Sequence, residues 1–309
     1  MPRLGVLRTL LRELTTTERA PRRTEPDLVM DDPDKVAAYV RGGREDGTLA
    51  PVYLFNCAQV SEVIRPGDTV VDLGCGPANQ LGMVARLHPG VDFIGLDLSD
   101  EMLSRAEQTV SDQGLSNVRL QRCDITDLEP FDDQSVDAVM STVVLHHLPD
   151  LGALERTFAE VRRVLKPGGG LYLVDFARLK AERSIDEFAY QHASRQHELL
   201  TLDYLYSLRA AFQRRQFEQL TDRHLRDRAR LYGTLGLSFM VAIKSACRAE
   251  SSSALIAALR EIYSSLRPAQ LTDLNDLSTF FALGGLESRL LGRAMGGWRP
   301  WLLRRIRRS

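Results

Sequence analysis

The chain has 309 residues, of which 44% are hydrophobic and 26% are charged, and its formal net charge is −1. This is the composition of an ordinary globular chain, long enough for a sizeable core and an appended subdomain, with no overall attraction to nucleic acid. The four cysteines show no Cys-x-x-Cys spacing, which argues against a metal site and a disulfide scaffold and favours a reducing compartment.

The N-terminal segment, residues 1–34, is predicted to be a helix followed by a linker. Leucines near 3.6-residue spacing indicate a short helix over residues 2–14, and residues 15–34 are polar and contain prolines. This segment lacks the apolar core of a signal peptide, and no apolar run approaches the roughly 18–20 residues of a membrane span. We therefore expect a cytoplasmic protein.

The central part of the chain alternates between apolar runs and helical patterns. A further helical stretch, residues 35–64, ends at a turn before the first strand. We then predict strands over residues 69–73, 91–96, 118–121, 136–141 and 171–175, and helices over residues 79–87, 99–113 and 150–165. Strands separated by helices of this length form βαβ units, so the sheet should be mainly parallel.

The second half of the chain is predicted to be mostly helical, with one hairpin. A helical insertion over residues 180–220 precedes two extended runs, 225–232 and 237–244, that can pair as an antiparallel hairpin at the sheet edge. An amphipathic helix over residues 251–267 should stop at Pro268, and residues 272–309 look helical but irregular. We therefore assign residues 35–247 to one domain and residues 248–309 to a helical C-terminal extension.

The tail of the chain is strongly basic. Residues 284–309 contain seven arginines and one glutamate, about +6, so the rest of the chain carries about −7. Both tryptophans, Trp298 and Trp301, alternate with these arginines, a combination that suits an interfacial membrane anchor. The alternative is a solvated helix whose tryptophans pack on the body. Nucleic-acid binding is not expected, and cofactor binding should survive truncation near Gly284.

The most informative motif is the turn Val70-Val71-Asp72-Leu73-Gly74-Cys75-Gly76-Pro77-Ala78. A dinucleotide fingerprint would require a third glycine at position 79, where Asn79 stands. Asp72 would also repel a pyrophosphate but can receive a cation. A zwitterionic, sulfonium-bearing amino acid therefore fits this turn better than a dinucleotide.

Three further features follow the ends of successive predicted strands. Asp97 lies 21 residues after Gly76, and its carboxylate offers enough lone pairs for both hydroxyls of a ribose. Asp124 follows the third strand, where an acid can accept a hydrogen bond from an adenine amine, and Ser141 ends the fourth strand. Because an open α/β sheet binds its ligand at the carboxyl ends of its strands, these residues together predict an adenosine site.

The motifs resemble those of the class I S-adenosylmethionine-dependent methyltransferases, in particular the ubiquinone/menaquinone C-methyltransferase-like group. The matching segments are residues 70–78, 95–99, 122–125, 135–148 and 165–174. The resemblance covers residues 66–176 and extends toward Lys244, because the family sheet ends in an antiparallel strand pair. It implies a Rossmann-like seven-stranded, mainly parallel sheet with helices on both faces, a helical N-terminal lid and the C-terminal helical extension.

The resemblance also implies roles for individual residues. Gly74 and Gly76 would flank the methionine moiety, Asp97 would hold the ribose, and Ile125 and Met102 would lie on the two faces of the adenine. The predicted cofactor-binding set is Asp72, Gly74, Cys75, Gly76, Asp97, Leu98, Met102, Asp124, Ile125 and Ser141. Asn79 and Gln80 depart from the glycine and hydrophobe that are usual in the family, which affects the methionine end.

The methyl acceptor should enter beyond the fourth strand, where His146 and His147 stand. Either histidine is a candidate catalytic base, although a packed or helix-capping role is the alternative for such a segment. Residues that can line the acceptor pocket are Tyr39, Tyr53, Asn56, His192, Tyr204 and Tyr206. The reaction requires no metal, since the sulfonium is already activated.

The sequence therefore predicts transfer of a methyl group from S-adenosylmethionine to a small-molecule acceptor by in-line displacement, in which positioning and desolvation dominate. Two alternatives remain open. One is a nicotinamide-dependent oxidoreductase, which would leave Asp124 unexplained. The other is a non-catalytic S-adenosylmethionine-binding interaction protein. The acceptor and the oligomeric state are not determined by the sequence.

Overall fold

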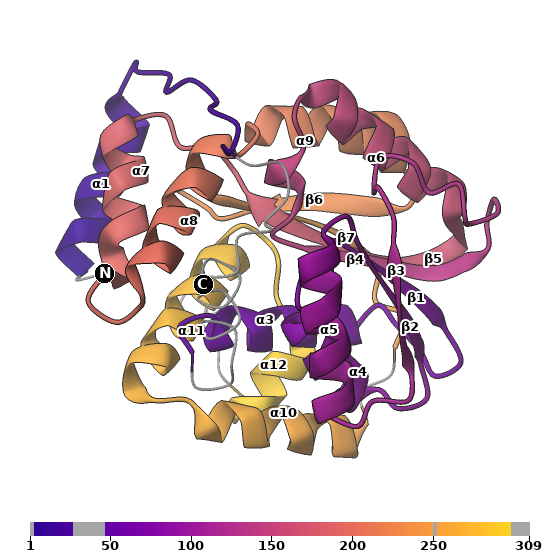
Figure 1. Cartoon of the computed structure of the whole chain (residues 1–309). Coiled ribbons are helices and arrows are strands. Elements are labelled where there is room, and N and C mark those ends of the chain that lie inside the picture. Colours follow the sequence, from indigo (N-terminus) through magenta and orange to yellow (C-terminus); the bar gives the residue numbers. More distant parts are fainter. Residues whose placement is uncertain (1–2, 27–46, 250–251, 298–309) are drawn as a thin grey trace.

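A computed structural model describes residues 3–26, 47–249 and 252–297 of the chain. Seven strands form one sheet in the order β3-β2-β1-β4-β5-β7-β6 (Figure 1). The strands are β1 Thr69–Leu73, β2 Asp92–Asp97, β3 Val118–Arg122, β4 Val136–Thr142, β5 Leu165–Phe176, β6 Ala229–Gly233 and β7 Met240–Ser245. The first five are parallel and β7 runs antiparallel to both of its neighbours, which confirms the predicted fold class.

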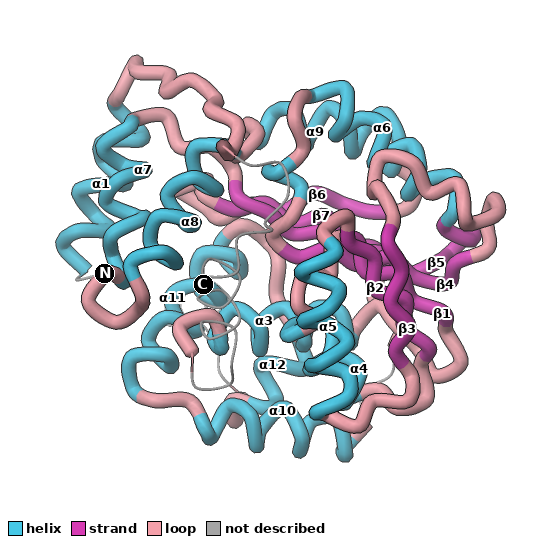
Figure 2. The backbone as a smooth tube through the Cα atoms, in the orientation of Figure 1, coloured by secondary structure: helices cyan, strands magenta, loops and turns pink. Residues whose placement is uncertain are grey.

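Helices cover both faces of this sheet (Figure 2). They are α1 Arg3–Thr15, α3 Ala50–Ser61, α4 Asn79–Leu87, α5 Asp100–Asp112, α6 Leu151–Val164, α7 Glu182–Ala189, α8 Glu198–Ala210, α9 Arg214–Leu220, α10 Ser253–Ser265, α11 Pro268–Leu283 and α12 Arg289–Ala294. Alternate residues of β1 point to opposite faces: Val70 joins the core under α3 and α4, whereas Val71 joins the core under α6 and α9. A parallel sheet with both faces covered needs such apolar strands.

Side-chain caps begin the helices that follow β2 and β4. The Ser99 hydroxyl accepts a hydrogen bond from the Met102 amide at 3.0 Å, and the Asp150 carboxylate accepts one from the Ala153 amide at 2.8 Å. Such caps satisfy amides that have no partner within the helix. The helix predicted from residue 99 therefore begins with Ser99 as its N-cap.

Two predicted boundaries were wrong. The strand predicted to start at residue 171 starts at Leu165, so residues 166–170 belong to β5, which pairs with β4 across an irregularity in register. Gly170 permits this path, because a Cβ there would lie 2.0 Å from the carbonyl oxygen of Val63. The helix predicted to stop at Pro268 does end before it, at Ser265, but the next helix, α11, begins at Pro268 itself rather than near residue 272. Proline suits this first position, because its missing N–H costs nothing there.

The N-terminal segment packs along the body of the molecule. Arg12 of α1 forms an ion pair with Glu187 at 2.8 Å. Residues 16–26, which we call the N-terminal strap, follow α1, and the Ala20 amide donates to the carbonyl of Lys180. The described part of the predicted linker is thus fixed to the domain. In the predicted helix 35–64, the described helical part is α3, and Tyr39 lies outside the described residues.

The C-terminal extension also packs onto the domain, against α3. Lys244 of β7 forms a buried ion pair with Glu62 at 2.5 Å, and the other Glu62 oxygen accepts hydrogen bonds from the Ser288 hydroxyl and the Leu290 amide. Trp298, Trp301 and the arginines beyond them lie outside the described residues, so the membrane anchor stays a prediction. Among the residues that the structure describes, no helix has both the length and the apolar character needed to cross a bilayer.

Candidate active site

A cavity of about 430 Å³ opens at the carboxyl ends of the parallel strands. Its walls come from α3, from the turn after β1, from the ends of β2, β3 and β4, and from α8 and α11. This volume is in the range of small-ligand sites. The position is the one at which open α/β sheets bind ligands.

The turn after β1 and the end of β2 form one side of this cavity. Gly74 and Gly76 adopt positive φ angles of 71° and 53°, and no described atom lies within 4 Å of the point where a Gly76 Cβ would stand. The Asp97 carboxylate accepts the Gly76 amide at 2.8 Å and the Ser99 amide at 2.9 Å. Burial raises the pKa of Asp97, and these amides offset part of the rise. The carboxylate is therefore fixed, with lone pairs left for a ligand.

Most of the predicted cofactor-binding residues line this side: Gly74, Cys75, Gly76, Asp97, Leu98, Met102, Asp124 and Ile125. Asp72 and Ser141 instead lie behind the wall. Ser141 is buried, and its hydroxyl donates to the carbonyl of Leu73 at 2.9 Å, which ties the ends of β1 and β4 together. Asp72 is also buried, and its Oδ1 has no hydrogen-bond partner among the described residues.

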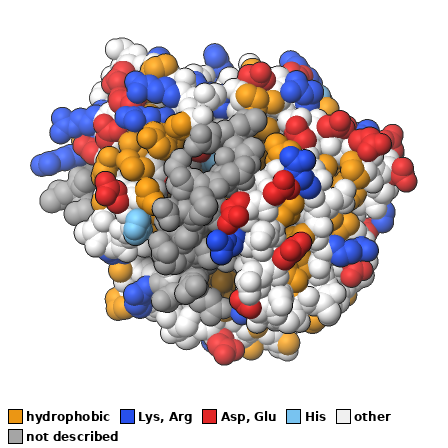
Figure 3. Space-filling view, in the orientation of Figure 1, with side chains coloured by type: hydrophobic (Ala, Val, Ile, Leu, Met, Phe, Trp, Pro, Cys, Tyr) orange, Lys and Arg blue, Asp and Glu red, His pale blue; other side chains and the backbone are white. Residues whose placement is uncertain are grey.

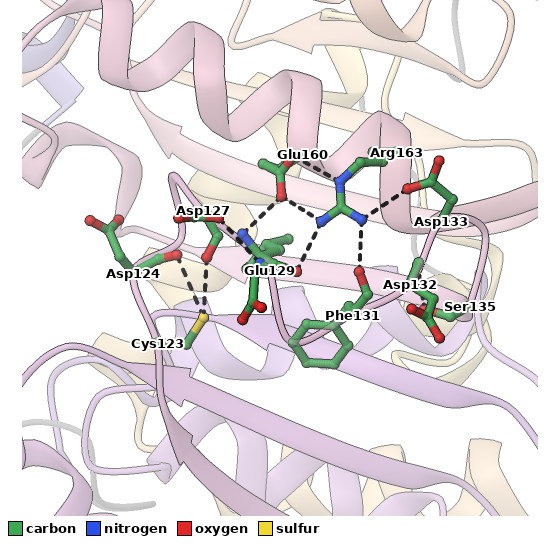
Figure 4. Close-up of polar contacts among 11 residues, drawn as sticks. Cys123, Asp124, Asp127, Glu129, Phe131, Asp132, Asp133, Ser135, Glu160 and Arg163 are labelled. Carbon is green, nitrogen blue, oxygen red and sulfur yellow. Dashed lines mark hydrogen bonds and ion pairs between the residues drawn. The ribbon is translucent and has the colours of Figure 1, made fainter.

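The loop after β3 is held by contacts that the sequence did not reveal (Figure 4). The Asp124 carboxylate accepts the Thr126 amide at 2.8 Å. From α6, Glu160 accepts the Leu128 amide at 2.8 Å, and Arg163 donates to the carbonyls of Leu128 and Phe131. This network fixes the backbone beyond Asp124, so the predicted adenine end of the cavity is preorganised.

A buried polar chain supports the α3 side of the cavity. The Tyr172 hydroxyl donates to Asn56 Oδ1 at 2.9 Å, the Asn56 amide donates to Gln80 Oε1 at 3.4 Å, and Gln80 donates to the Tyr53 carbonyl at 3.2 Å. Asn56, Tyr53 and Gln80 all line the cavity. Gln80, which departs from the family pattern, therefore has a structural partner in Asn56.

His146 and His147 stand on a short 3₁₀ turn, Leu145–His147, at the far side of the cavity from Asp124 in the strand order. Val143 precedes this turn with a φ of 60°, which is unusual for a β-branched residue, and it turns the chain so that Val144 packs on Gly74. His146 is buried. Its Nδ1 lies 2.7 Å from Asp175 Oδ1, and its amide donates to Asp175 Oδ2.

His147 is the more accessible of the two, with 29% of its side chain exposed. Its Nδ1 lies 3.2 Å from Glu25 of the N-terminal strap, and both histidines line the cavity. Neither Glu25 nor Asp175 was predicted as a site residue. Asp175 ends a predicted strand at the ligand-binding edge, and this position could have identified it as a site residue. Glu25 lies in a segment without hydrophobic periodicity, so the sequence offers no such signal for it.

The predicted acceptor residues divide into three groups. Tyr53, Asn56, His192 and Tyr204 line the cavity, Tyr206 is not among its described wall residues, and Tyr39 is outside the described residues. Four aromatic side chains that the sequence analysis missed complete the wall, and two of these come from the helices α7 and α11. They are Phe176, Phe188, Phe239 and Phe280.

Comparison with known proteins finds relatives of the central part of the chain. Residues 70–169 match the model of a methyltransferase domain. The chain is 35% identical over 113 residues to an arsenite methyltransferase of Halobacterium salinarum, which covers 36% of this chain and 28% of that protein. It is 35% identical over 107 residues to a demethylmenaquinone methyltransferase of Bacillus subtilis, with 34% and 44% covered.

The chain thus spans less than half the length of these curated relatives. An O-methyltransferase family protein from Burkholderia thailandensis shares the fold, with a TM-score of 0.53 and 17% identity over 79% of this chain and 70% of that one. The chain carries a class I S-adenosylmethionine-dependent methyltransferase domain.

The residues of this methyltransferase domain fit its cofactor, S-adenosylmethionine. The open space at Gly76 and the fixed Asp97 carboxylate provide room and hydrogen-bond acceptors, and Asp124 and Ile125 provide the polar and apolar groups for an adenine. On the face of the methyltransferase in Figure 3, acidic and basic side chains of the described residues are interspersed.

Proposed function

We propose that this protein transfers the methyl group of S-adenosylmethionine to a small-molecule acceptor bound between the histidine pair, α8 and α11. The observation that carries the proposal is the composition of a single cavity. One side holds Asp97 and Asp124, and the other holds His146 and His147 beside an aromatic wall. Two chemically different halves in one cavity suit a cofactor and a second substrate.

When bound, S-adenosylmethionine supplies a methyl group already activated by the sulfonium charge. The protein's own residues then have two tasks. Asp97 and Asp124 orient the adenosine, and the aromatic wall excludes water from the acceptor side. Orientation of two reactants is worth about 7–11 kcal/mol in favourable cases, which explains how such a site can work without a nucleophile.

The histidine pair supports an acceptor that must lose a proton, such as a hydroxyl group or a carbon acid. His147 exposes part of its ring to the cavity while Glu25 engages its Nδ1, so its Nε2 is the atom that can take the acceptor proton. The aromatic wall, with Phe176 and Phe239, supports an acceptor with an apolar skeleton. The relatives' named acceptors, arsenite and demethylmenaquinone, differ in chemistry and support only the general class.

Two alternative functions are less well supported. A nicotinamide-dependent oxidoreductase would need a glycine at position 79, where Asn79 begins α4. A non-catalytic binding protein would leave the His146–Asp175 contact and the adjoining aromatic wall without a use.

The proposed cofactor role of Asp97 gives the first prediction. Asp97→Ala should weaken S-adenosylmethionine binding by about 100-fold, because charged hydrogen bonds of roughly 1.5–3 kcal/mol each are lost. Asp92→Ala is the matched control, since Asp92 is an exposed carboxylate at the opposite end of the same strand. Calorimetric titration measures both, and release of S-adenosylhomocysteine with a panel of phenols and carbon acids tests turnover. Equal affinity in the two variants would contradict the assignment.

The basic tail supports a second prediction, of peripheral membrane contact. The full chain should co-sediment with vesicles that contain anionic lipid, because arginines attract such a surface. A chain ending at Gly297 lacks Trp298, Trp301 and five arginines and should remain in the supernatant. Equal partitioning of the two chains would rule the tail out as an anchor.

A further inference from the structure

The N-terminal strap, residues 16–26, reaches the histidine pair from a distant part of the sequence. Its backbone is hydrogen-bonded to the body at Ala20 and at Arg23, whose amide donates to the Arg209 carbonyl at 3.0 Å. Two of its side chains, Arg22 and Glu25, make contacts with the turn that carries the histidines. These contacts are unnecessary for the cofactor side of the cavity, which lies at the ends of β1 to β3.

Arg22 clamps the strap onto the backbone of that turn. Its guanidinium donates to the carbonyls of His146 at 2.9 Å, Pro149 at 2.6 Å and Ala210 at 2.6 Å, and also to that of Leu148. It also lies 4.0 Å above the ring of Phe212. One side chain thus joins the strap, the histidine turn and the end of α8.

The clamp places Glu25 at the edges of both imidazole rings. Its carboxylate oxygens lie 3.2 Å from His147 Nδ1 and 3.5 Å from His146 Nε2, and the Ser207 hydroxyl donates to it at 2.9 Å. With the 2.7 Å contact between His146 and Asp175, the four side chains form a continuous series. It runs from Asp175 in the core to His147 at the cavity.

We propose that Glu25 is a positioning residue, which the strap supplies to orient His147 and to stabilise the positive charge that His147 gains when it takes the acceptor proton. The inference rests on the proposed function. In this step the acceptor's O–H or C–H bond breaks, an N–H bond forms at His147 Nε2, and the electron pair stays on the acceptor atom that receives the methyl group. Glu25, bonded to Nδ1, fixes the neutral tautomer with its lone pair on Nε2 and stabilises the imidazolium that follows.

The charges around His147 agree with this role. Burial lowers the pKa of His147, but the hydrogen bond to Glu25 and its charge outweigh burial, with Asp203 and Asp175 adding to the rise. Asp97, on β2, also interacts electrostatically with His147. The centroids of the His146 and His147 rings lie 4.3 Å apart. Burial raises the pKa of Glu25, yet its contacts with His147, His146 and Ser207 leave it lowered overall.

The buried edge of His146 also faces Glu25. His146 is 1% exposed, and its Nε2 has no hydrogen-bond partner among the described residues. The nearest carboxylate oxygen is that of Glu25, at 3.5 Å. Glu25 therefore faces a ring nitrogen of each histidine, and its placement links the two side chains.

The test is a titration of the histidine side chains by NMR in the full-length protein, with and without S-adenosylhomocysteine. Glu25→Gln should lower the pKa of His147, shift its tautomer balance and reduce turnover by up to about 100-fold. The acidic limb of the rate profile should move to lower pH, because the base must be neutral to act. Glu18→Gln is the control: Glu18 lies on the same strap but contacts the Glu182 amide at the surface.

Arg22→Gln separates placement from simple charge. Loss of a nearby cation alone would raise the pKa of His147, whereas release of the strap withdraws Glu25 and lowers it. A lowered pKa in Arg22→Gln, with S-adenosylhomocysteine affinity retained, supports the proposal. A raised pKa, or an unchanged His147 titration in Glu25→Gln, would overturn it.

Failure of the proposed function has a different signature, since it would appear as absent cofactor binding in the unmodified protein. A last outcome concerns metal ions, because the ligand atoms of Glu25, His146 and His147 lie within 4.8 Å of one another. Stoichiometric Zn²⁺ binding that is lost in Glu25→Gln would assign the cluster to a cation and overturn the proton role.

Discussion

At the scale of single residues, the site depends on where each carboxylate lies rather than on its presence in a motif. Asp97 faces the cavity and accepts two backbone amides. Asp72, on the neighbouring strand, is buried behind the wall, and one of its oxygens has no hydrogen-bond partner within the described part of the chain. The sequence identified both acids, but strand alternation and packing decide which one reaches a ligand, and neither can be determined from spacing alone.

The burial of Asp72 gives a prediction about stability. Burial and the charge of Asp97 raise the pKa of Asp72 to about 8 from its ordinary value of 3.8. Because the pKa of Asp72 is higher in the folded state than in the unfolded state, its contribution to the free energy of unfolding is fully present below about pH 4. That contribution is lost as the pH rises through about 8. Asp72→Asn should therefore gain stability relative to the unmodified protein between pH 5 and pH 9. Urea denaturation without cofactor measures this, and parallel pH dependences would contradict it.

At the scale of elements, the parallel strands and their helices were predictable because short apolar runs alternate with helical patterns. The start of β5 was not, since Gly168, Gly169 and Gly170 resemble a turn, yet β5 begins at Leu165 and its pairing with β4 is interrupted between Leu165 and Gly170. The acceptor side was largely unpredictable. Glu25 lies more than 100 residues from His147 in the sequence, and Phe280 comes from α11 of the extension. Only long-range packing brings these residues to the cavity.

The extension gives a prediction that reverses the expectation from sequence. A chain ending at Gly284 loses three buried leucines, Leu286, Leu290 and Leu291, and the partners of buried Glu62. Burial of each leucine stabilises the fold by roughly 1.5–3 kcal/mol. The three together therefore approach the whole free energy of unfolding of a typical domain. This truncation should therefore abolish folding and cofactor binding, whereas a chain ending at Gly297 should retain both. Thermal denaturation compares them, and a well-folded shorter chain would show that the extension is dispensable.

At the scale of the whole molecule, the two halves of the cavity come from different parts of the chain. Residues 70–169, which match the family model, supply the cofactor side and the histidine turn. The strap, the insertion and the C-terminal extension supply the remaining acceptor-side contacts, with Glu25, Tyr204 and Phe280 as examples. This division explains why the family motifs predict residues on the proposed cofactor side but leave the acceptor undefined.

The most direct test of this account is the ligand that the intact protein prefers. Calorimetric titration of the full-length chain with S-adenosylmethionine and, separately, with NAD should give saturable binding of the first and none of the second. The reason is that, in the proposed site, Asp97 and Asp124 hold one adenosine, while Asn79 stands where a pyrophosphate-binding glycine is needed. Binding of NAD without S-adenosylmethionine would contradict the account.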